Sequence, residues 1–173
     1  MALDLSEPLQ KVIDGLAEDF SDALIDVYQS SGDTFVRIKP EANVEVCRYL
    51  KEEHHFIYLT DVIGADRFTS EERFEVIYNL VSLRDRERLF VKAWLEEENP
   101  EITSITEVWE SANWFERQTY DMFGINFTNH PDLRRMYMPE DFEYYPLRKE
   151  FPLLGIPGSI ELPSSTPDSE HEI

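Results

Sequence analysis

Proline is concentrated after Gly124, and this distribution divides the 173-residue chain into two parts. Seven of the ten prolines lie there, at positions 131, 139, 146, 152, 157, 163 and 167. Because proline fixes φ and lacks a backbone N–H, neither a long helix nor a central strand continues through this spacing. We therefore expect a folded domain over residues 1–124 and an extended segment after it.

The sequence up to Gly124 shows both helical and strand periodicities. Apolar residues at helical spacing predict helices from Ser6 and Pro8 to about Phe20, from Pro40 to about Glu53, and over 105–122. Ser104 and Glu107 have capping-box spacing at the start of the third helix. Strands are predicted over 23–29, 34–39, 56–63, 73–83 and 88–95. The predicted fold class is α+β, a mainly antiparallel sheet with flanking helices, followed by an extended proline-rich arm.

The segment over residues 125–162 is richer in apolar residues than a disordered linker. We expect an extended arm that becomes ordered when its apolar side chains lie on another surface. A partner protein is the favoured surface, and the arm's own domain is the alternative. Residues 163–173 are expected to form a frayed terminus.

Composition excludes several classes of partner. The formal net charge of -20 opposes binding to nucleic acid, whose phosphates require clustered lysine and arginine, and it disfavours direct binding to anionic lipid. No apolar stretch approaches the roughly 18 residues of a membrane span, so no direct membrane insertion is expected. The first ten residues lack the basic flank and apolar region of a signal peptide. The single cysteine, Cys47, cannot by itself form a disulfide or hold an iron–sulfur cluster, and we expect it to pack as a small apolar residue.

Motifs for phosphate, flavin, metal-cluster and acyl-transfer chemistry are missing from the sequence. His54 and His55 are adjacent, so their side chains diverge and do not suit one metal ion. The glutamates at 96–98 and 101 lack the Asp, Asn and Gly residues of a calcium loop. Both groups are expected to be solvated, and no catalytic residue, bound cofactor or metal is predicted for this chain.

The densest group of unusual residues spans positions 116–135. Arg117 and Asp121 stand one helical turn apart and can pair, and Gly124 is expected to end the helix. Phe123 and Phe127, with Ile125 between them, are expected to anchor the chain as it leaves the helix.

His130 and Asp132 permit two interpretations. They can form an acid–base pair, or they can fix a turn beside an interface as mutual partners. The second is favoured because no nucleophile or substrate pocket is evident. Pro131 keeps His130 extended. Of Arg134 and Arg135, one is expected to hold the turn while the other points outward.

Two motifs in this region carry a family resemblance. ERQTYDMFGINF at 116–127, followed by HPDLRR at 130–135, closely resembles the signature of the NuoC-type (30-kDa) subunit of respiratory complex I. PLRKEFP at 146–152 resembles the tail element of the same family. The match departs at Gln118, where the family usually has glutamate. The order of elements over 1–115 is compatible with the family.

The resemblance implies a non-catalytic structural and assembly subunit of NADH:quinone oxidoreductase. Its C-terminal arm would clamp the hydrogenase-like large (49-kDa, NuoD-type) subunit near the quinone site. Neighbouring subunits would hold the iron–sulfur clusters, the flavin and the quinone, and the assembly would couple electron transfer to proton translocation. The chain would lie peripherally on the cytoplasmic side of the bacterial inner membrane. The residues implied at the interface or in its support are Glu116, Arg117, Tyr120, Asp121, Phe123, Gly124, Phe127, His130, Pro131, Asp132, Leu133, Arg134, Arg135, Pro146, Leu147, Arg148, Phe151 and Pro152.

Three alternatives stay open at the level of the sequence. The equivalent subunit of an energy-converting hydrogenase, or of a ferredoxin- or F420-linked dehydrogenase, shares the resemblance. A free-standing acid–base enzyme would use His130 and Asp132 and would turn over a substrate alone. A generic acidic adaptor would bind partners without stable co-assembly.

Overall fold

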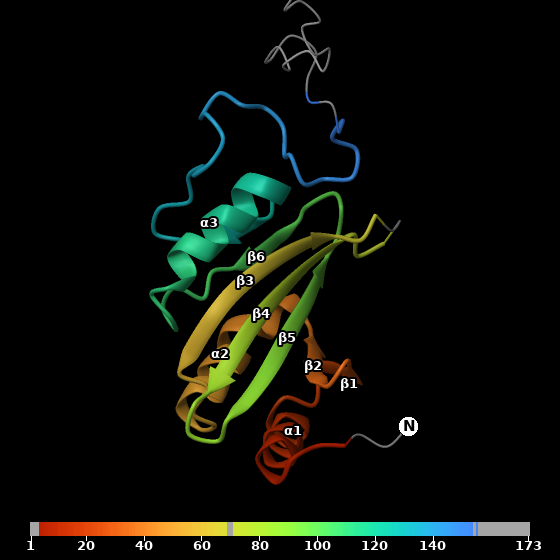
Figure 1. Ribbon diagram of the computed structural model, residues 1–173, viewed down its shortest axis with the longest axis vertical. Helices are drawn as coiled ribbons and strands as arrows, with labels where there is room; N and C mark the ends of the chain where they lie inside the picture. The colour runs from red at the N-terminus through yellow and green to blue at the C-terminus, as the bar shows by residue number, and fades with distance from the viewer. Residues whose placement is uncertain (1–3, 69–70, 154, 156–173) are drawn as a thin grey trace, which may run out of the picture.

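A five-stranded sheet lies at the centre of the computed structural model, which describes residues 4–68, 71–153 and 155 (Figure 1). In the order β1-β2-β5-β4-β3, its strands are β1 (Leu24–Ser30), β2 (Asp33–Ile38), β5 (Glu87–Leu95), β4 (Phe74–Ser82) and β3 (Tyr58–Asp66). The β2/β5 pair is parallel and the other three pairs are antiparallel. The predicted class, α+β with a mainly antiparallel sheet, is therefore confirmed.

Two helices in the first half of the chain bury one apolar stripe each. Helix α1 (Glu7–Asp19) begins where the Ser6 side chain accepts a hydrogen bond of 3.3 Å from the backbone N–H of Leu9. Its buried residues are Leu9, Val12, Ile13 and Leu16. The single-turn helix η1 (Pro40–Ala42) leads into α2 (Asn43–Glu52), which buries Asn43, Val46, Cys47 and Leu50. Cys47 is fully buried, which confirms its predicted packing role.

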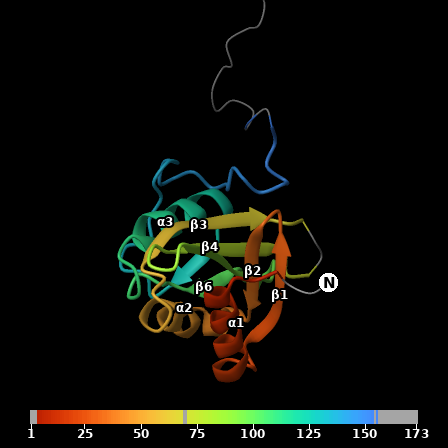
Figure 2. The same cartoon turned by 60° about the horizontal axis from the view of Figure 1, so that its bottom comes forward.

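The sheet has two unlike faces because successive side chains of a strand point in opposite directions. On the core face, the buried residues of the two central strands are Phe74, Val76, Tyr78 and Leu80 of β4 and Leu89, Val91, Ala93 and Leu95 of β5. Helix α2 lies behind these strands in Figure 1. The opposite face, which we name the open face, carries half-buried side chains, and among the described residues no helix packs on it. Figure 2 shows α1 and α2 together at one side of the sheet.

Helix α3 (Ala112–Phe123) begins seven residues later than predicted, so the expectation of a helix over 105–122 was wrong at its start. Turns at 106–108 and 110–111 take the place of its first part. The physical reason is that Ser104 does not cap a helix. Its hydroxyl donates to the Glu116 carboxylate at 2.6 Å and accepts from the backbone N–H of Thr106 at 3.1 Å. Tertiary hydrogen bonding therefore overrides the capping-box spacing.

Gly124 ends α3 with a φ of 72°, as predicted. The chain then forms β7 (Asn126–Thr128), which pairs in parallel with β6 (Glu101–Thr103). The sequence did not predict this three-residue strand. The strand fits before the first proline of the arm, and the buried Ile125 and Phe127 fasten it to the core.

Helix α3 lies close against strand β3. A Cβ atom on Gly64 of β3 would come within 2.7 Å of side-chain carbons of Thr119 and Phe123. Thr119 also donates its hydroxyl to the Val62 carbonyl at 2.8 Å. This close approach fixes the position of the α3 C-terminus, from which the arm departs. Within the described ranges, no helix has the length and apolar character needed to cross a membrane.

Candidate functional site

The arm after residue 128 runs over the end of α3 and across one end of the sheet (Figure 1). Hydrogen bonds and ion pairs along its length, from His130 to Glu150, attach it to its own domain. Two buried carboxylates, Asp121 and Asp66, are among the groups that hold the arm. The described part of the arm therefore lies on its own domain, the surface that the sequence had made the alternative.

Asp121 holds the first part of the arm. Its Oδ2 atom accepts hydrogen bonds from the backbone N–H groups of Met136, Tyr137 and Met138 at 2.9, 2.6 and 3.0 Å. Its Oδ1 atom lies 2.7 Å from Nη1 of Arg135. Burial raises the pKa of Asp121, but these donors outweigh it and the net pKa is lowered. The carboxylate is therefore charged at neutral pH, and both of its oxygens accept hydrogen bonds from the arm.

Arg117 does not pair with Asp121, and that prediction was wrong. Its Nε and Nη2 atoms donate instead to the carbonyls of Arg134 and Arg135, at 3.1 and 3.3 Å. Arg135 takes the Asp121 carboxylate because the arm folds back across the helix end. Arg135 also donates to the Tyr144 carbonyl at 3.2 Å, so it locks the turn. Arg134 is exposed and points outward, as expected for one of the two arginines.

Asp66 and Arg73 hold the second part of the arm. The Arg73 guanidinium binds both carboxylate oxygens of the fully buried Asp66 side chain, at 2.9 and 2.7 Å. Asp66 also accepts from the backbone N–H of Lys149 at 2.8 Å, and Arg73 forms a further ion pair with Glu150. The hydrogen bonds from Arg73 are the main reason that the pKa of Asp66 is lowered to about 2.

Arg148 closes the arm onto the end of α3. Its Nε atom donates to the Phe123 carbonyl at 2.6 Å, and its guanidinium lies 4.6 Å from the Tyr145 ring centre. A Cβ atom on Gly124 would lie 2.6 Å from Nη2 of Arg148. Leu147 donates its backbone N–H to the Met122 carbonyl at 3.1 Å. The glycine at 124 is therefore required twice, for its φ angle and for this close approach.

Large apolar side chains of the arm point outward from these attachments. The exposed fractions are 58% for Tyr137, 48% for Tyr144 and 52% for Leu147, and Leu153 is fully exposed. We name these four residues the arm ridge. Trp114, on the outer side of α3, is 60% exposed. Because buried polar groups hold the backbone as far as Glu150, the Tyr137, Tyr144 and Leu147 side chains of the arm ridge are held in one arrangement.

Glu116 is buried beneath the start of the arm. It accepts hydrogen bonds from Ser104 at 2.6 Å and from the backbone N–H of Ile105 at 2.8 Å, and so ties the 104–105 turn to α3. Its carboxylate lies 3.9 Å from Nε2 of His130. Burial raises the pKa of Glu116 to about 7, against the lowering effect of the two hydrogen bonds.

Within the described residues, the Asp132 carboxylate forms no hydrogen bond or ion pair with His130, so the structure does not bring the two side chains together as an acid–base pair, but His130 and Asp132 are partners in a turn. Nδ1 of His130 accepts from the backbone N–H of Asp132 at 3.0 Å, which leaves Nε2 to donate to the Asn113 carbonyl at 3.2 Å. The Asp132 carboxylate pairs with Arg134 at 3.0 Å. Burial is the main cause of a lowered pKa of His130. His130 thus fixes a turn through the backbone of Asp132.

The remaining predicted residues divide between the core and the surface. Phe127 is buried, and Tyr120, Phe123 and Leu133 pack against the core cluster from half-buried positions. Leu133 therefore contacts this chain's own core. Pro131 and Pro152 are exposed, whereas Pro146 and Phe151 are half-buried within the arm. The part of the predicted arm at 156–162, and the predicted tail at 163–173, lie outside the described residues.

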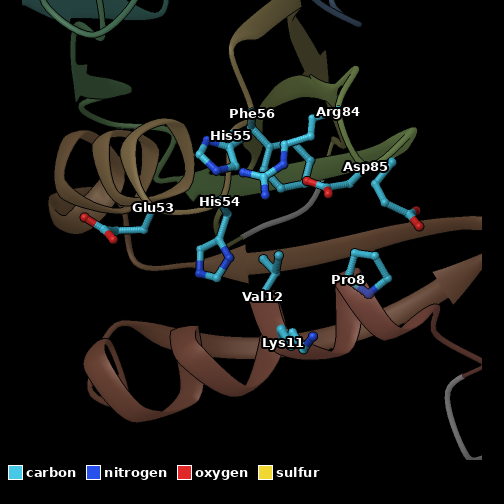
Figure 3. Close-up of a pocket in the computed structure, with 10 residues that line it drawn as sticks. Pro8, Lys11, Val12, Glu53, His54, His55, Phe56, Arg84 and Asp85 are labelled. Carbon is cyan, nitrogen blue, oxygen red and sulfur yellow. The ribbon is translucent and has the colours of Figure 1, made fainter.

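A hollow of about 250 Å³ lies between α1, the end of α2 and the β4–β5 turn (Figure 3). His54 and His55 both line it, and His54 packs against the Tyr49 ring with centroids 5.0 Å apart. Burial lowers the pKa of His54. Lys11 and Arg84, together with Glu53, Asp85 and Glu87, belong to its lining, so both signs of charge are present. Nothing in this arrangement selects a ligand of one charge.

Across the described residues, no group of three or more His, Cys, Asp or Glu side chains is placed to hold a metal ion.

Sequence reasoning missed Asp66 and Arg73, which carry the second attachment. They are separated from Lys149 by 83 and 76 positions along the chain. The available signal was Arg73, a charged residue at the start of the predicted strand over 73–83, since a buried strand end rarely keeps an unpaired charge; Asp66 lies three residues beyond the predicted strand over 56–63.

Comparisons with known proteins agree with the family resemblance. The family model described as the respiratory-chain NADH dehydrogenase, 30 Kd subunit, matches residues 36–156. The NADH-quinone oxidoreductase C subunit of Roseiflexus sp. (strain RS-1) is 43% identical over 155 residues, covering 88% of this chain and 87% of that protein. The corresponding C 2 subunit of Rhizobium etli (strain CIAT 652) is 45% identical over 142 residues, covering 81% of this chain and 75% of that protein.

Two solved structures share the fold. A trypsin-resistant fragment (1-134) of Nqo5 is 34% identical, with a TM-score of 0.64, and the match covers 73% of this chain and 99% of the fragment. A chain of the membrane-bound sulfane sulfur reductase, an archaeal respiratory membrane complex, is 18% identical with a TM-score of 0.73. That match covers 86% of this chain and 88% of the other, and it shows similarity of fold alone. On the family model and the curated relatives, the chain belongs to the family of the 30-kDa subunit of the respiratory-chain NADH dehydrogenase.

Proposed function

We propose that this chain is a structural and assembly subunit of the peripheral arm of NADH:quinone oxidoreductase and contributes no catalytic residue of its own. In this proposal its arm ridge binds the hydrogenase-like large (49-kDa, NuoD-type) subunit near the quinone site. Membership of the family of complex I subunits supports a place in such an assembly. Iron–sulfur clusters, flavin and quinone are proposed to belong to neighbouring subunits. The chain is proposed to lie peripherally on the cytoplasmic side of the inner membrane.

The observation that carries the clamp role is the contrast between the two sides of the arm. Its backbone is fixed to the domain by Asp121, Asp66 and Arg148. Its arm ridge points into solvent, although burial of one such apolar side chain would stabilise a contact by about 1.5–3 kcal/mol. An arm held in one arrangement before it binds loses little conformational entropy on association. The arm therefore supports a rigid contact between subunits.

Rigid placement is the contribution expected of such a subunit. Electron transfer and its coupling depend on groups that are held in fixed relative positions, and supporting side chains outside a site provide this order. The proposed role is therefore to keep catalytic neighbours in register, and an isolated chain is expected to show no redox turnover.

Limited trypsin digestion tests the clamp. Arg134 and Lys149 are exposed on the arm and provide cleavage sites. Cleavage requires local opening of the arm, and a bound partner would oppose that opening. In the intact assembly, cleavage at these two positions is therefore expected to be slower than in the isolated full-length chain by about tenfold or more. Arg84, in the β4–β5 turn, provides a reference site away from the arm. Equal cleavage rates at the arm positions in the assembly and in the isolated chain would contradict the proposal.

A second candidate is the equivalent subunit of an energy-converting hydrogenase or of a ferredoxin- or F420-linked dehydrogenase. The fold shared with the archaeal sulfane sulfur reductase complex is the observation in its favour. The curated relatives with identities of 41–48% are subunits of NADH-quinone oxidoreductase, which favours the first candidate. The presence of a flavin- and NADH-binding subunit in the purified assembly would distinguish the two.

A further inference from the structure

The open face of the sheet is more apolar than a solvated sheet face normally is. When helices cover one side of an antiparallel sheet, the other side usually carries polar residues. Here several half-buried or exposed positions on that side are large and apolar, namely Phe35, Ile63, Ile77, Val81, Phe90 and Trp94. Ile63 is 38% exposed. A contiguous apolar surface on a soluble protein often marks a site of interaction with another molecule.

An aromatic ladder crosses the open face over three neighbouring strands. The rings of Tyr28 and Phe35 stack at 5.1 Å with an interplanar angle of 11°, and those of Phe35 and Phe90 stack at 4.9 Å with an angle of 18°. Lys92 lies 4.7 Å from the centre of the Phe35 ring and pairs with Glu75 at 3.0 Å. The ladder is therefore a flat, ordered apolar surface whose adjacent lysine already has its counterion.

Two arginines beside the ladder have no counterion in the part of the chain that the structure describes. The guanidinium groups of Arg37 and Arg67 lie 3.9 and 3.5 Å from the ring centre of Trp94. Nε of Arg37 is buried without a hydrogen-bond partner, and Nη1 of Arg67 makes one contact of 3.4 Å with the Glu72 carbonyl. Strand register places Asp26 opposite Arg37, yet among the described residues no carboxylate lies within 4.0 Å of either guanidinium. In a chain of net charge -20, two such arginines on one tryptophan are an unusual combination.

We propose that the open face is a second docking surface, independent of the arm, and that it binds an acidic segment of another subunit of the assembly. Apolar side chains of that segment would lie on the aromatic ladder. Separate carboxylates of the segment would be bound by Arg37 and by Arg67, since guanidinium groups bind carboxylates through paired hydrogen bonds. A polyanion such as nucleic acid is disfavoured because the chain as a whole repels it.

Site-specific photo-crosslinking in the intact assembly tests this proposal. A benzophenone amino acid replaces Phe90 on the open face, Tyr137 on the arm ridge, or Glu18 on the exposed side of α1 as the control. Crosslinking from Phe90 to an acidic segment of another subunit is the expected result. Crosslinks from Phe90 to this chain itself, to a second copy of it, or to nothing above the Glu18 background would overturn the proposal.

The Tyr137 probe separates this proposal from the proposed function. Crosslinking from Tyr137 without crosslinking from Phe90 would leave the clamp role intact and remove the second surface. Crosslinking from Phe90 without crosslinking from Tyr137 would support the second surface and would contradict the clamp role. Neither outcome depends on whether a charge variant folds.

Charge reversal tests the arginines themselves. Arg37→Glu and Arg67→Glu, each made with the Phe90 probe, are expected to lower the crosslink yield by about tenfold, because a like charge opposes the partner's carboxylate. Arg84→Glu, in the β4–β5 turn, is the matched control and should leave the yield unchanged. Thermal unfolding of the isolated chain shows whether each variant folds. An undiminished yield from a folded Arg37→Glu or Arg67→Glu variant would contradict the role of the arginine pair.

Discussion

Oδ2 of Asp121 lies 2.6 Å from the backbone nitrogen of Tyr137, and the amides on either side of Tyr137 donate to the same oxygen. One carboxylate at the end of α3 thus orders three consecutive residues of the arm. Tyr137, whose amide is bound, sends its ring into solvent with 58% of the residue exposed. This contact links the local order of the arm to the arm ridge, the surface that we propose a partner binds.

Asp121→Ala is expected to release the first part of the arm. The substitution leaves three backbone N–H groups and the Arg135 guanidinium without their acceptor, a loss of about 3 kcal/mol for a broken buried ion pair. Hydrogen exchange of the Met136, Tyr137 and Met138 amides measures this loss, and their protection should fall while that of β4 persists. Asp132→Ala, which removes an exposed partner of Arg134, is the control and should change the exchange little. Unchanged protection in Asp121→Ala would show that other contacts hold the arm.

Asp66→Asn is expected to lower the free energy of unfolding by about 3 kcal/mol, because Arg73 loses its buried counterion. The pKa of Asp66 is lowered to about 2 from an ordinary value of 3.8. Its stabilising contribution is therefore complete above pH 3.8 and is lost only as the pH falls through about 2. Urea unfolding should give the same difference between wild type and variant at pH 6 and at pH 8. Asp33→Asn, at an exposed pair with Arg88, is the control. An equal loss of unfolding free energy in that variant would contradict the claim that the buried Asp66–Arg73 pair contributes more than an exposed pair.

Glu116→Gln is expected to change how stability depends on pH. The folded-state pKa of Glu116 is raised from 4.5 to about 7, so its proton stabilises the fold fully below pH 4.5, and this contribution is lost as the pH rises through about 7. The full loss amounts to about 3 kcal/mol. The amide oxygen of an uncharged glutamine can accept from the Ile105 N–H while its NH2 group donates to the Ser104 hydroxyl, so the variant should lose less stability than wild type between pH 5 and pH 8 in urea unfolding. Glu110→Gln, at an exposed position, should follow wild type. Parallel stability curves for wild type and Glu116→Gln would contradict the raised pKa.

Leu147→Asp and Leu133→Asp are expected to fail at different steps. Leu147 is 52% exposed, so its substitution should leave the isolated chain folded and reduce its recovery in the assembly by about tenfold, through an unpaired charge in an apolar contact. Leu133 packs against the chain's own core, so its substitution should destabilise the isolated chain itself. Circular dichroism of the isolated variants and quantitative co-purification measure the two effects. His130→Gln serves as a variant at a buried side chain outside the ridge. Full recovery of Leu147→Asp with the assembly would remove that residue from the interface.

Regular elements of the domain were predictable because their signals are local. Alternation in β4 and β5 follows from one face being buried, and Gly124 marks a helix end because its φ of 72° strains other residues. Cys47 was correctly placed in the core on chemistry alone. The start of α3 was not predictable from local spacing, since Ser104 bonds to Glu116 across 12 positions.

The course of the arm was not predictable for the same physical reason. Arg117 and Asp121 have ideal spacing for a pair, but each is taken by the folded-back arm. Proline spacing correctly excluded long elements after Gly124, yet it carries no information on which surface the arm contacts. The contact between Asp66 and Lys149 spans 83 positions and depends on the assembled sheet.

The most direct test of the central claim is to identify what binds the arm ridge. The tagged chain and its Leu147→Asp variant are purified gently from native membranes, and the co-purifying proteins are quantified by mass spectrometry. The account predicts that the wild-type chain recovers a hydrogenase-like large subunit together with iron–sulfur subunits, and that the variant loses the large subunit first. Recovery of the wild-type chain as a lone protein, or equal recovery of the large subunit by both, would contradict it.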